Sequence, residues 1–241
     1  GMVLGAVAVG NPEKAHGFIS SLKQPPQVLA LSELSTDADI VIECAPAAVL
    51  RELATPVLRA GKTLVILSVG ALLLNDDLIA LAKACHASIR VPTGALLGLD
   101  ALIAAAEGEI HSVTMKSSKP PQGFHGAPFL VQRGIDVLGI DAPLQLYAGS
   151  AREAATGFPA NLNVAIAASL AGIGVDQTRL EIWADPTITR NTHELVVESD
   201  SARLTMKIEN IPSENPKTGR ITAQSVIALL RKMGGHLAIG T

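Results

Sequence analysis

Residues 40–68, IVIECAPAAVLRELATPVLRAGKTLVILS, decide the fold of this 241-residue chain. The run 40–44 predicts a strand, Ala45-Pro46 ends it and opens a helix, and Gly61 stops that helix. Residues 63–68 predict the next strand. Two strands joined through one helix by short connections indicate a parallel sheet covered by helices.

The same alternation extends in both directions along the chain. Asn11 is placed to cap a short helix that Pro12 starts, and Asn75-Asp76-Asp77 to cap a later one. The other elements predicted here are strands at 3–9, 28–31 and 88–91 and helices at 12–15 and 75–87. Residues 1–92 are therefore predicted to form a Rossmann-like domain with a doubly wound parallel sheet, in which the run 3–9 is buried on both faces.

Ligands of such sheets bind outside the carboxyl ends of the strands. Here those ends carry small residues that let a flat ligand approach the backbone: Gly10-Asn11, Ala45-Pro46, Ser68-Val69-Gly70 and Thr93-Gly94-Ala95. The glycine-rich signature G-x-G-x-x-G is absent, and Gly61-Lys62-Thr63 lacks the first glycine of a P-loop because residue 56 is proline. We therefore expect that the first strand and glycine-rich turn of an N-terminally truncated domain have been lost from the front, which makes the run 3–9 its second strand.

After Pro92, consecutive strands replace the alternation of strands and helices. Residues 203–210 alternate apolar with polar side chains, which predicts a sheet covered on one face. The other elements predicted here are strands at 110–117, 144–148, 179–184 and 193–198 and helices at 99–106, 151–156 (capped by Ser150), 159–171 and 220–233. Residues 119–123 are predicted to form a proline-glycine loop, and 124–143 are unassigned. Residues 93–215 are thus predicted to form an α+β catalytic and dimerisation domain with a mixed sheet, and the C-terminal helix region 216–241 to return to the first domain.

The composition is that of a globular protein with a small-molecule ligand. Hydrophobic residues make up 48% of the chain and charged residues 17%, which excludes a disordered chain. A net charge of -3, the lack of a basic run and only 2% aromatic residues argue against nucleic acid as a partner. The apolar runs are too short to span a membrane. Cys44 and Cys85 lie too far apart in the sequence to suggest a metal site or a disulfide framework, and the histidines do not have the spacing of metal ligands. We expect a cytoplasmic protein without a bound metal.

His193 begins a run in which His193, Leu195 and Val197 alternate with Glu194 and Glu198. Period-two alternation places the histidine on the face of the strand that should be buried. A histidine there is either a hydrogen-bonded core residue or an acid and base group in a cleft. The first case is the commoner one for a single histidine.

Three further polar placements leave a structural and a functional interpretation open. Asn161 and Asn163 lie in the first turns of an apolar helix, where one of them can cap the helix and both can bind a ligand carboxamide. Asp185-Pro186 forms a turn in the simplest interpretation, and the aspartate can also serve a site. Lys217 lies in a proline-containing segment that is either only a linker or a part of the site, where its positive charge attracts an acidic substrate.

Five parts of the chain together resemble the L-aspartate dehydrogenase family, and the likeness runs from near residue 3 to the C-terminus. They are IECA (42–45), PTGALLGLD (92–100), FPANLNVA (158–165), ADP (184–186) with NTH (191–193), and ENIPSENPKT (209–218). Each part is a weak signal alone. Their joint occurrence in this order is specific.

The resemblance implies oxidation of L-aspartate by NAD or NADP to iminoaspartate, which hydrolyses to oxaloacetate and ammonia or feeds nicotinamide cofactor synthesis. His193 matches the family's catalytic histidine, and Asn191 and Lys217 are the expected substrate-binding residues. The family also suggests a homodimer, for which an uncovered face of the second sheet supplies the surface. The residues that match cofactor-binding positions are Ala95 and one of Asn161 and Asn163 at the nicotinamide, with Ala45 and Ser68 at the flanking turns.

The sequence departs from the family pattern at two positions that bind the cofactor in a typical member. A typical member has a glycine-rich turn that supplies backbone donors for the pyrophosphate. After the second strand, Gly10-Asn11 offers no acidic residue for the adenine ribose, so that NAD and NADP are equally open. The function is open as well, between an aspartate dehydrogenase and a truncated, non-catalytic homologue that acts as a small-acid binding or assembly module. A dehydrogenase of the same architecture for another amino or hydroxy acid is the third alternative.

Overall fold

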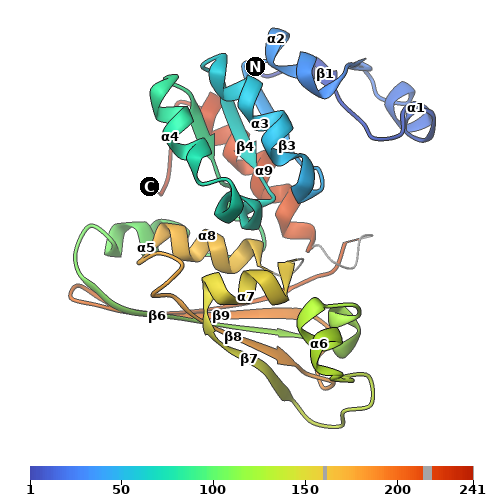
Figure 1. Ribbon diagram of the computed structural model, residues 1–241. Coiled ribbons are helices and arrows are strands. Elements are labelled where there is room, and N and C mark those ends of the chain that lie inside the picture. The colour runs from blue at the N-terminus through green and yellow to red at the C-terminus, as the bar shows by residue number, and fades with distance from the viewer. Residues whose placement is uncertain (160–161, 214–218, 241) are drawn as a thin grey trace. The chain divides into compact units, whose positions relative to one another are not determined.

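The computed structural model describes residues 1–159, 162–213 and 219–240. The chain divides into two compact units, Gly1–Val91 and Pro92–Thr241 (Figure 1). This division falls beside Pro92, where the alternation of strands and helices in the sequence ends. The C-terminal helix belongs to the second unit, and its return to the first domain stays a prediction.

A parallel three-stranded sheet forms the centre of the first unit. It consists, in this order, of β3 (Ile40–Glu43), β4 (Thr63–Ile66) and β5 (Ser88–Arg90). Helix α3 (Leu50–Arg59) connects β3 with β4 and packs beside α4 (Asp77–Ala84) (Figure 1). The apolar positions of α3 recur with helical spacing and are all buried: Leu50, Leu53, Ala54, Val57 and Leu58. The strand, helix and strand predicted from residues 40–68 are confirmed.

The N-terminal apolar run is exposed. β1 (Ala6–Val7) pairs in parallel with β2 (Gln27–Val28) in a separate two-stranded sheet. Val3 is 78% exposed and Leu4 is 56% exposed, so the predicted burial of 3–9 on both faces is wrong. In the described part of the chain β1 has a single neighbouring strand, and an apolar strand becomes buried on both faces only where other elements cover both.

The two predicted helix caps of this unit differ in outcome. Helix α1 (Pro12–Ser20) starts as predicted, with Asn11 Oδ1 accepting the Lys14 backbone N–H at 3.0 Å. Asn75 instead donates its side-chain amide to the Ala71 carbonyl oxygen at 2.8 Å, and α4 begins at Asp77 with no side-chain cap among the described residues. The remaining helical turns are η1 (Leu31–Glu33), α2 (Leu34–Asp37), η2 (Ala47–Val49) and η3 (Val69–Leu74).

The second unit is built on a mixed five-stranded sheet with the order β10-β9-β6-β8-β7. β6 and β8 run parallel, and the other neighbours are antiparallel. The strands are β6 (Ile110–Lys119), β7 (Leu144–Ser150), β8 (Arg179–Ala184), β9 (Asn191–Ser199) and β10 (Arg203–Asn210). The predicted mixed sheet is confirmed. However, β6 runs on to Lys119 past its predicted end at Ser117, and β9 begins at Asn191 instead of His193, because pairing with β8 and β10 continues there.

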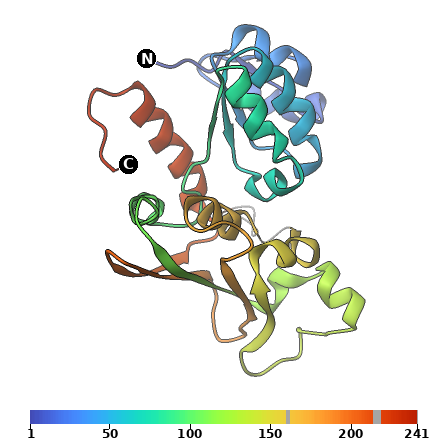
Figure 2. The same ribbon diagram turned by 60° about the vertical axis from the view of Figure 1, so that its left-hand side comes forward.

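Helices α5 (Leu99–Ala105), α7 (Ala151–Gly157) and α8 (Asn163–Ala171) lie on one face of this sheet (Figures 1 and 2). Met115, Leu180 and Leu195 stand side by side on neighbouring strands and are almost completely buried. The core of the unit therefore lies between the sheet and its helices.

Other helical segments complete the second unit. Helix α8 begins at Asn163, later than the predicted residue 159. The segment η4 (Pro121–Phe124) lies mostly where a loop is predicted, and α6 (Pro128–Arg133) occupies part of the stretch that the sequence left unassigned. Helix α9 (Arg220–Gly234) forms as predicted. No helix in the described residues is both long and apolar enough to cross a membrane.

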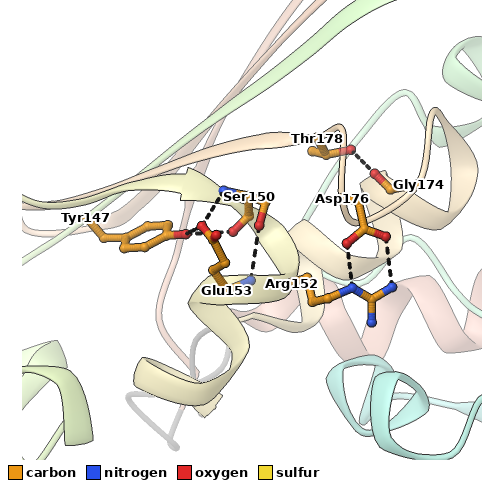
Figure 3. A network of polar contacts seen from close by, with 7 residues as sticks. All are labelled: Tyr147, Ser150, Arg152, Glu153, Gly174, Asp176 and Thr178. Atoms are coloured by element: carbon orange, nitrogen blue, oxygen red, sulfur yellow. Dashed lines mark hydrogen bonds and ion pairs between the residues drawn. The ribbon is translucent and has the colours of Figure 1, made fainter.

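Figure 3 shows how the start of α7 is fixed. Ser150 Oγ accepts the Glu153 backbone N–H at 3.2 Å, and the Glu153 carboxylate accepts the Ser150 N–H at 3.4 Å and the Tyr147 hydroxyl at 3.1 Å. This reciprocal capping box confirms the cap predicted at Ser150. The Arg152 guanidinium binds the Asp176 carboxylate through two hydrogen bonds, which ties α7 to the segment before β8.

Candidate active site

Glu43, the last residue of β3, is fully buried and ties the ends of two strands together. Its Oε1 accepts the Ala45 N–H at 2.7 Å and the Ser68 hydroxyl at 3.0 Å. Its Oε2 accepts the backbone N–H groups of Leu67 at 3.1 Å and Ser68 at 2.8 Å. Four hydrogen bonds satisfy the buried carboxylate and hold the turns that follow β3 and β4 in fixed positions.

Ala45 and Ser68, the cofactor-binding residues predicted in the first unit, are thereby brought together. The Ser68 hydroxyl lies 3.0 Å from the Ala45 carbonyl oxygen as well as from Glu43. Both residues are half-buried, and their small side chains leave room for a ligand close to the backbone. The two turns follow the carboxyl ends of parallel strands, where ligands of this fold bind. The residues present therefore fit one edge of a flat cofactor.

His193 lies on β9, between β6 and β10. Ser117 and Ile208 stand opposite it on these two strands. Its side chain is 3% exposed and shares a face with Leu195 and Val197, which are fully buried. The predicted burial of this face is confirmed, since the helices of the unit cover it (Figure 1).

Burial sets the charge state of His193. It lowers the pKa of the imidazole to about 3, and the positive charge of Lys119 is the second cause. The imidazole is therefore neutral at physiological pH and has a ring nitrogen that can accept a proton. Within the described part of the chain, Nδ1 is buried and has no hydrogen-bond partner. Buried polar atoms are nearly always paired, so an unpaired ring nitrogen favours a ligand site over a purely structural role.

A second unpaired polar atom lies at the same end of the sheet. Asn191 stands opposite Asn210 of β10, and both residues share the face of His193. Asn210 Nδ2 donates to the Ala95 carbonyl oxygen at 3.1 Å, whereas Asn210 Oδ1 is buried without a partner among the described residues. The structure thus brings together three of the predicted site residues: His193, Asn191 and Ala95.

The remaining predicted residues have different outcomes. Asn163 is the first residue of α8 and is exposed. Asp185 Oδ1 accepts the Thr187 N–H at 2.8 Å and the Thr187 hydroxyl at 2.6 Å, which confirms the turn at Asp185-Pro186. Asn161 and Lys217 lie outside the described residues. Where the chain is described, no group of three or more His, Cys, Asp or Glu side chains is placed to hold a metal ion.

Three residues of these clusters escape prediction from the sequence: Glu43, Lys119 and Asn210. Glu43 occurs in a segment of family resemblance without a role of its own, and Lys119 is assigned to a loop because Pro120 and Pro121 follow it. Each of the three is the last residue of its strand and is buried. A polar residue at the end of a strand is the feature that these three share, and ligand-binding groups collect at strand ends.

Two family models match the chain. The model described as "Aspartate dehydrogenase, C-terminal" matches residues 100–233, which is more than half of the chain. The model described as "Homoserine dehydrogenase, NAD binding domain" matches residues 1–92 and confirms the Rossmann-like prediction for the first unit.

Individual relatives agree with the family models. L-aspartate dehydrogenase of Bradyrhizobium diazoefficiens is 58% identical over 241 residues, which are 100% of this chain and 86% of that protein. L-aspartate dehydrogenase 3 of Bordetella bronchiseptica is 60% identical over 100% of this chain and 89% of its own length. The crystal structure of aspartate dehydrogenase from Thermotoga maritima shares the fold with a TM-score of 0.76, at 24% identity, over 99% of this chain and 100% of that one. The chain therefore belongs to the L-aspartate dehydrogenase family.

Proposed function

We propose that this protein oxidises L-aspartate to iminoaspartate with NAD or NADP, and that the imine hydrolyses to oxaloacetate and ammonia or feeds the synthesis of nicotinamide cofactors. The observation that carries the proposal is His193, which is buried, neutral and unpaired at Nδ1 within the described chain. Relatives that are 58% and 60% identical over the whole chain are named L-aspartate dehydrogenases, which supports this substrate.

In this proposal the neutral imidazole of His193 is the proton acceptor. When bound, the nicotinamide ring supplies the acceptor for the hydride that leaves the α-carbon of the substrate. His193 takes one proton from the substrate nitrogen as the carbon–nitrogen double bond forms. A base that is already neutral in the free protein can accept this proton without first losing one.

The cofactor is proposed to contact small or amide side chains and the backbone beside them. The proposed cofactor-binding residues are Ala45, Ser68, Ala95, Asn161 and Asn163, and the proposed substrate-binding residues are Asn191 and Lys217. Asn11 is engaged in capping α1, and the turn Gly10-Asn11 carries no acidic residue to select NAD by its ribose hydroxyl. We therefore include both NAD and NADP in the proposal.

Two measurements on the 241-residue protein test the proposal. NADH fluorescence is titrated with and without L-aspartate, and the reduction of NAD and NADP by L-aspartate is followed by absorbance. Saturable NADH binding together with turnover of L-aspartate supports the enzyme. Turnover of a different amino or hydroxy acid in a substrate panel would replace aspartate as the substrate. Absence of both binding and turnover would indicate a non-catalytic binding or assembly module.

The proposal also includes a homodimer in the cytoplasm. Helices cover one face of the second sheet (Figure 1), while the half-exposed side chains of Lys116, Trp183 and Val196 lie on the other. Lys116 Nζ lies 4.9 Å from the centre of the Trp183 ring. Large apolar side chains that stay partly exposed on a sheet face are a common contact surface between identical subunits. Cys44 and Cys85 are both free thiols, as is usual in a reducing compartment.

A further inference from the structure

Lys119 is a buried cation that has no role in the predicted site. It is the last residue of β6 and is 8% exposed. Lysine is rarely buried, because an ammonium group that leaves water loses hydration that only an anion or strong acceptors restore. Burial lowers the pKa of Lys119 to about 8, which leaves the side chain mostly charged at neutral pH. A charged group in this position is suited to act on an anion.

The sheet register places Lys119 beside His193. Ser117 stands opposite His193 in the ladder between β6 and β9, and Lys119 follows Ser117 on the same face. Diagonal neighbours on one face of a sheet are within reach of a long side chain. The electrostatics agree with this placement, since the charge of Lys119 is the second cause of the low pKa of His193.

Neighbouring residues contact both the side chain and the backbone of Lys119. Gly123 of η4 packs against it, so that a Cβ at Gly123 would lie 3.5 Å from Lys119 Cβ and 3.7 Å from Cδ. The Lys119 carbonyl oxygen accepts the Asp185 N–H at 2.9 Å. Lys119 is therefore fixed at the end of β6, next to the turn that leads the chain from β8 towards His193.

The polar residues at this end of the sheet differ in charge. Asn191 and Asn210 are neutral amides, and His193 is a neutral imidazole. Among these four residues, Lys119 therefore carries the positive charge. L-aspartate brings two carboxylates into such a site. In a poorly hydrated environment an ammonium group binds a carboxylate more strongly than a neutral donor does.

We infer that the Lys119 ammonium group binds a carboxylate of the substrate beside His193, an inference that rests on the proposed oxidation of L-aspartate. The carboxylate places a negative charge beside Lys119 and His193. This charge opposes the effect of Lys119 on His193, so that bound substrate makes the imidazole a stronger base than it is in the free protein.

The inference is tested with Lys119→Met and Lys119→Arg, and with Lys116→Met as the matched control. Lys116 lies on the same strand but on the opposite face, over the Trp183 ring. We expect Lys119→Met to raise KM for L-aspartate about 100-fold, because one partner of a buried charge pair is removed. The NADH dissociation constant stays unchanged, and circular dichroism checks that the variant is folded.

The other variants separate charge from packing. Lys119→Arg keeps the charge and is expected to retain part of the affinity for L-aspartate, whereas Lys116→Met leaves KM unchanged. A folded Lys119→Met protein with the wild-type KM overturns the inference and leaves the proposed function standing. Should Lys119→Met fail to fold, Lys119→Gln takes its place in the same comparison.

A binding measurement makes the test independent of turnover. Succinate has both carboxylates but no amino group to oxidise, and its affinity is measured by titration calorimetry in the presence of NADH. Weaker succinate binding by Lys119→Met than by the wild type supports the inference, even if the wild type fails to oxidise L-aspartate and the proposed function falls. Equal succinate binding by the two proteins overturns the inference.

Discussion

His193 and His111 show how strongly position determines what a histidine can do. His193 is buried, and its pKa is lowered to about 3 by burial and, to a lesser extent, by Lys119. His111 is exposed on β6 and lies 3.8 Å from the Glu109 carboxylate. Both side chains come from the same sheet, so that a substitution at His111 controls for the loss of an imidazole in general.

We predict that His193→Ala lowers kcat for L-aspartate by about 100-fold to 10,000-fold, the usual contribution of a positioned proton-transfer group. NADH binding, measured by fluorescence, should be largely retained, because the role of His193 lies in the proton transfer. His111→Ala is expected to leave both quantities unchanged. An undiminished rate in the His193→Ala protein would falsify the assignment of His193 as the base.

Glu43 supports a prediction about the first unit. In Glu43→Gln one of the two side-chain oxygens becomes an amide nitrogen, which cannot accept hydrogen bonds from Ala45, Leu67 or Ser68. We expect the free energy of unfolding of this unit to fall by about 2–4 kcal/mol, since buried donors lose a charged acceptor. NADH affinity should fall with it, because the turns that carry Ala45 and Ser68 loosen.

Urea unfolding followed by circular dichroism, together with NADH titration, measures both effects of Glu43→Gln. The matched control is Glu33→Gln, since the exposed Glu33 carboxylate accepts a single N–H from Ala30 at 2.9 Å. Its loss should cost at most about 1 kcal/mol, because water takes the place of the exposed carboxylate. Equal destabilisation by the two substitutions would show that the buried network around Glu43 contributes little.

At the scale of strands and helices, interiors are predictable from the sequence and ends are less so. The alternation at 203–210 and the apolar runs at 40–44 and 63–68 are patterns that each segment carries in its own sequence. The end of β6 depends instead on a partner, because Ala184 of β8 pairs with Lys119 beyond the predicted boundary. No periodicity in the sequence indicates this pairing. Lys119 is therefore assigned to a loop, and its place at the end of a buried strand is missed.

The candidate site follows the same division. Ala45 and Ser68 can be placed at strand ends from local pattern, and the alternation around His193 predicts its buried face. The contacts of Glu43 with Ser68 and of Asn210 with Ala95 join residues far apart in the chain. Such contacts depend on tertiary structure, and the roles of the site residues come from family resemblance.

The start of α7 allows two kinds of interaction to be compared (Figure 3). We predict that Ser150→Ala lowers the free energy of unfolding by about 1 kcal/mol, the usual cost of losing an N-cap. Arg152→Ala should cost less, because its ion pair with Asp176 is exposed and such pairs are worth about 0–1 kcal/mol. Urea unfolding followed by Trp183 fluorescence measures both, and a larger loss from Arg152→Ala would contradict this order.

At the scale of the whole molecule, the two units carry different parts of the proposed chemistry. The first unit matches an NAD-binding domain and holds the turns of Ala45 and Ser68 through the buried Glu43 carboxylate. The second unit contributes the neutral imidazole of His193 and the cation of Lys119. Substitution of Glu43 in the first unit should therefore lower cofactor affinity, whereas substitution of His193 in the second unit should impair proton transfer.

Assembly can be followed with a single probe, because Trp183 is the only tryptophan of the chain and lies on the sheet face opposite the helices. Its indole N–H lies 3.3 Å from the Glu181 carboxylate, and its ring is half-buried in the isolated chain. If this face forms the dimer contact, dilution below the dissociation constant should shift Trp183 emission to longer wavelength as water reaches the ring. Sedimentation velocity over the same concentrations should show dimer giving way to monomer.

Val196→Lys tests the proposed surface directly, since it places a charge on the same sheet face as Trp183. We expect this variant to sediment as a monomer and to show the red-shifted emission at every concentration, because a charged side chain is costly to desolvate in a subunit contact even with Glu194 and Glu198 on the same face. Ser32→Lys, at an exposed position of the first unit, adds the same charge and should remain dimeric. A wild-type protein that is monomeric at all concentrations would remove the dimer from the proposal. A Val196→Lys protein that stays dimeric would place the contact on another surface. In a twofold dimer the same patch of both subunits forms the contact, so a contact at this sheet face would bury the new lysine of each subunit.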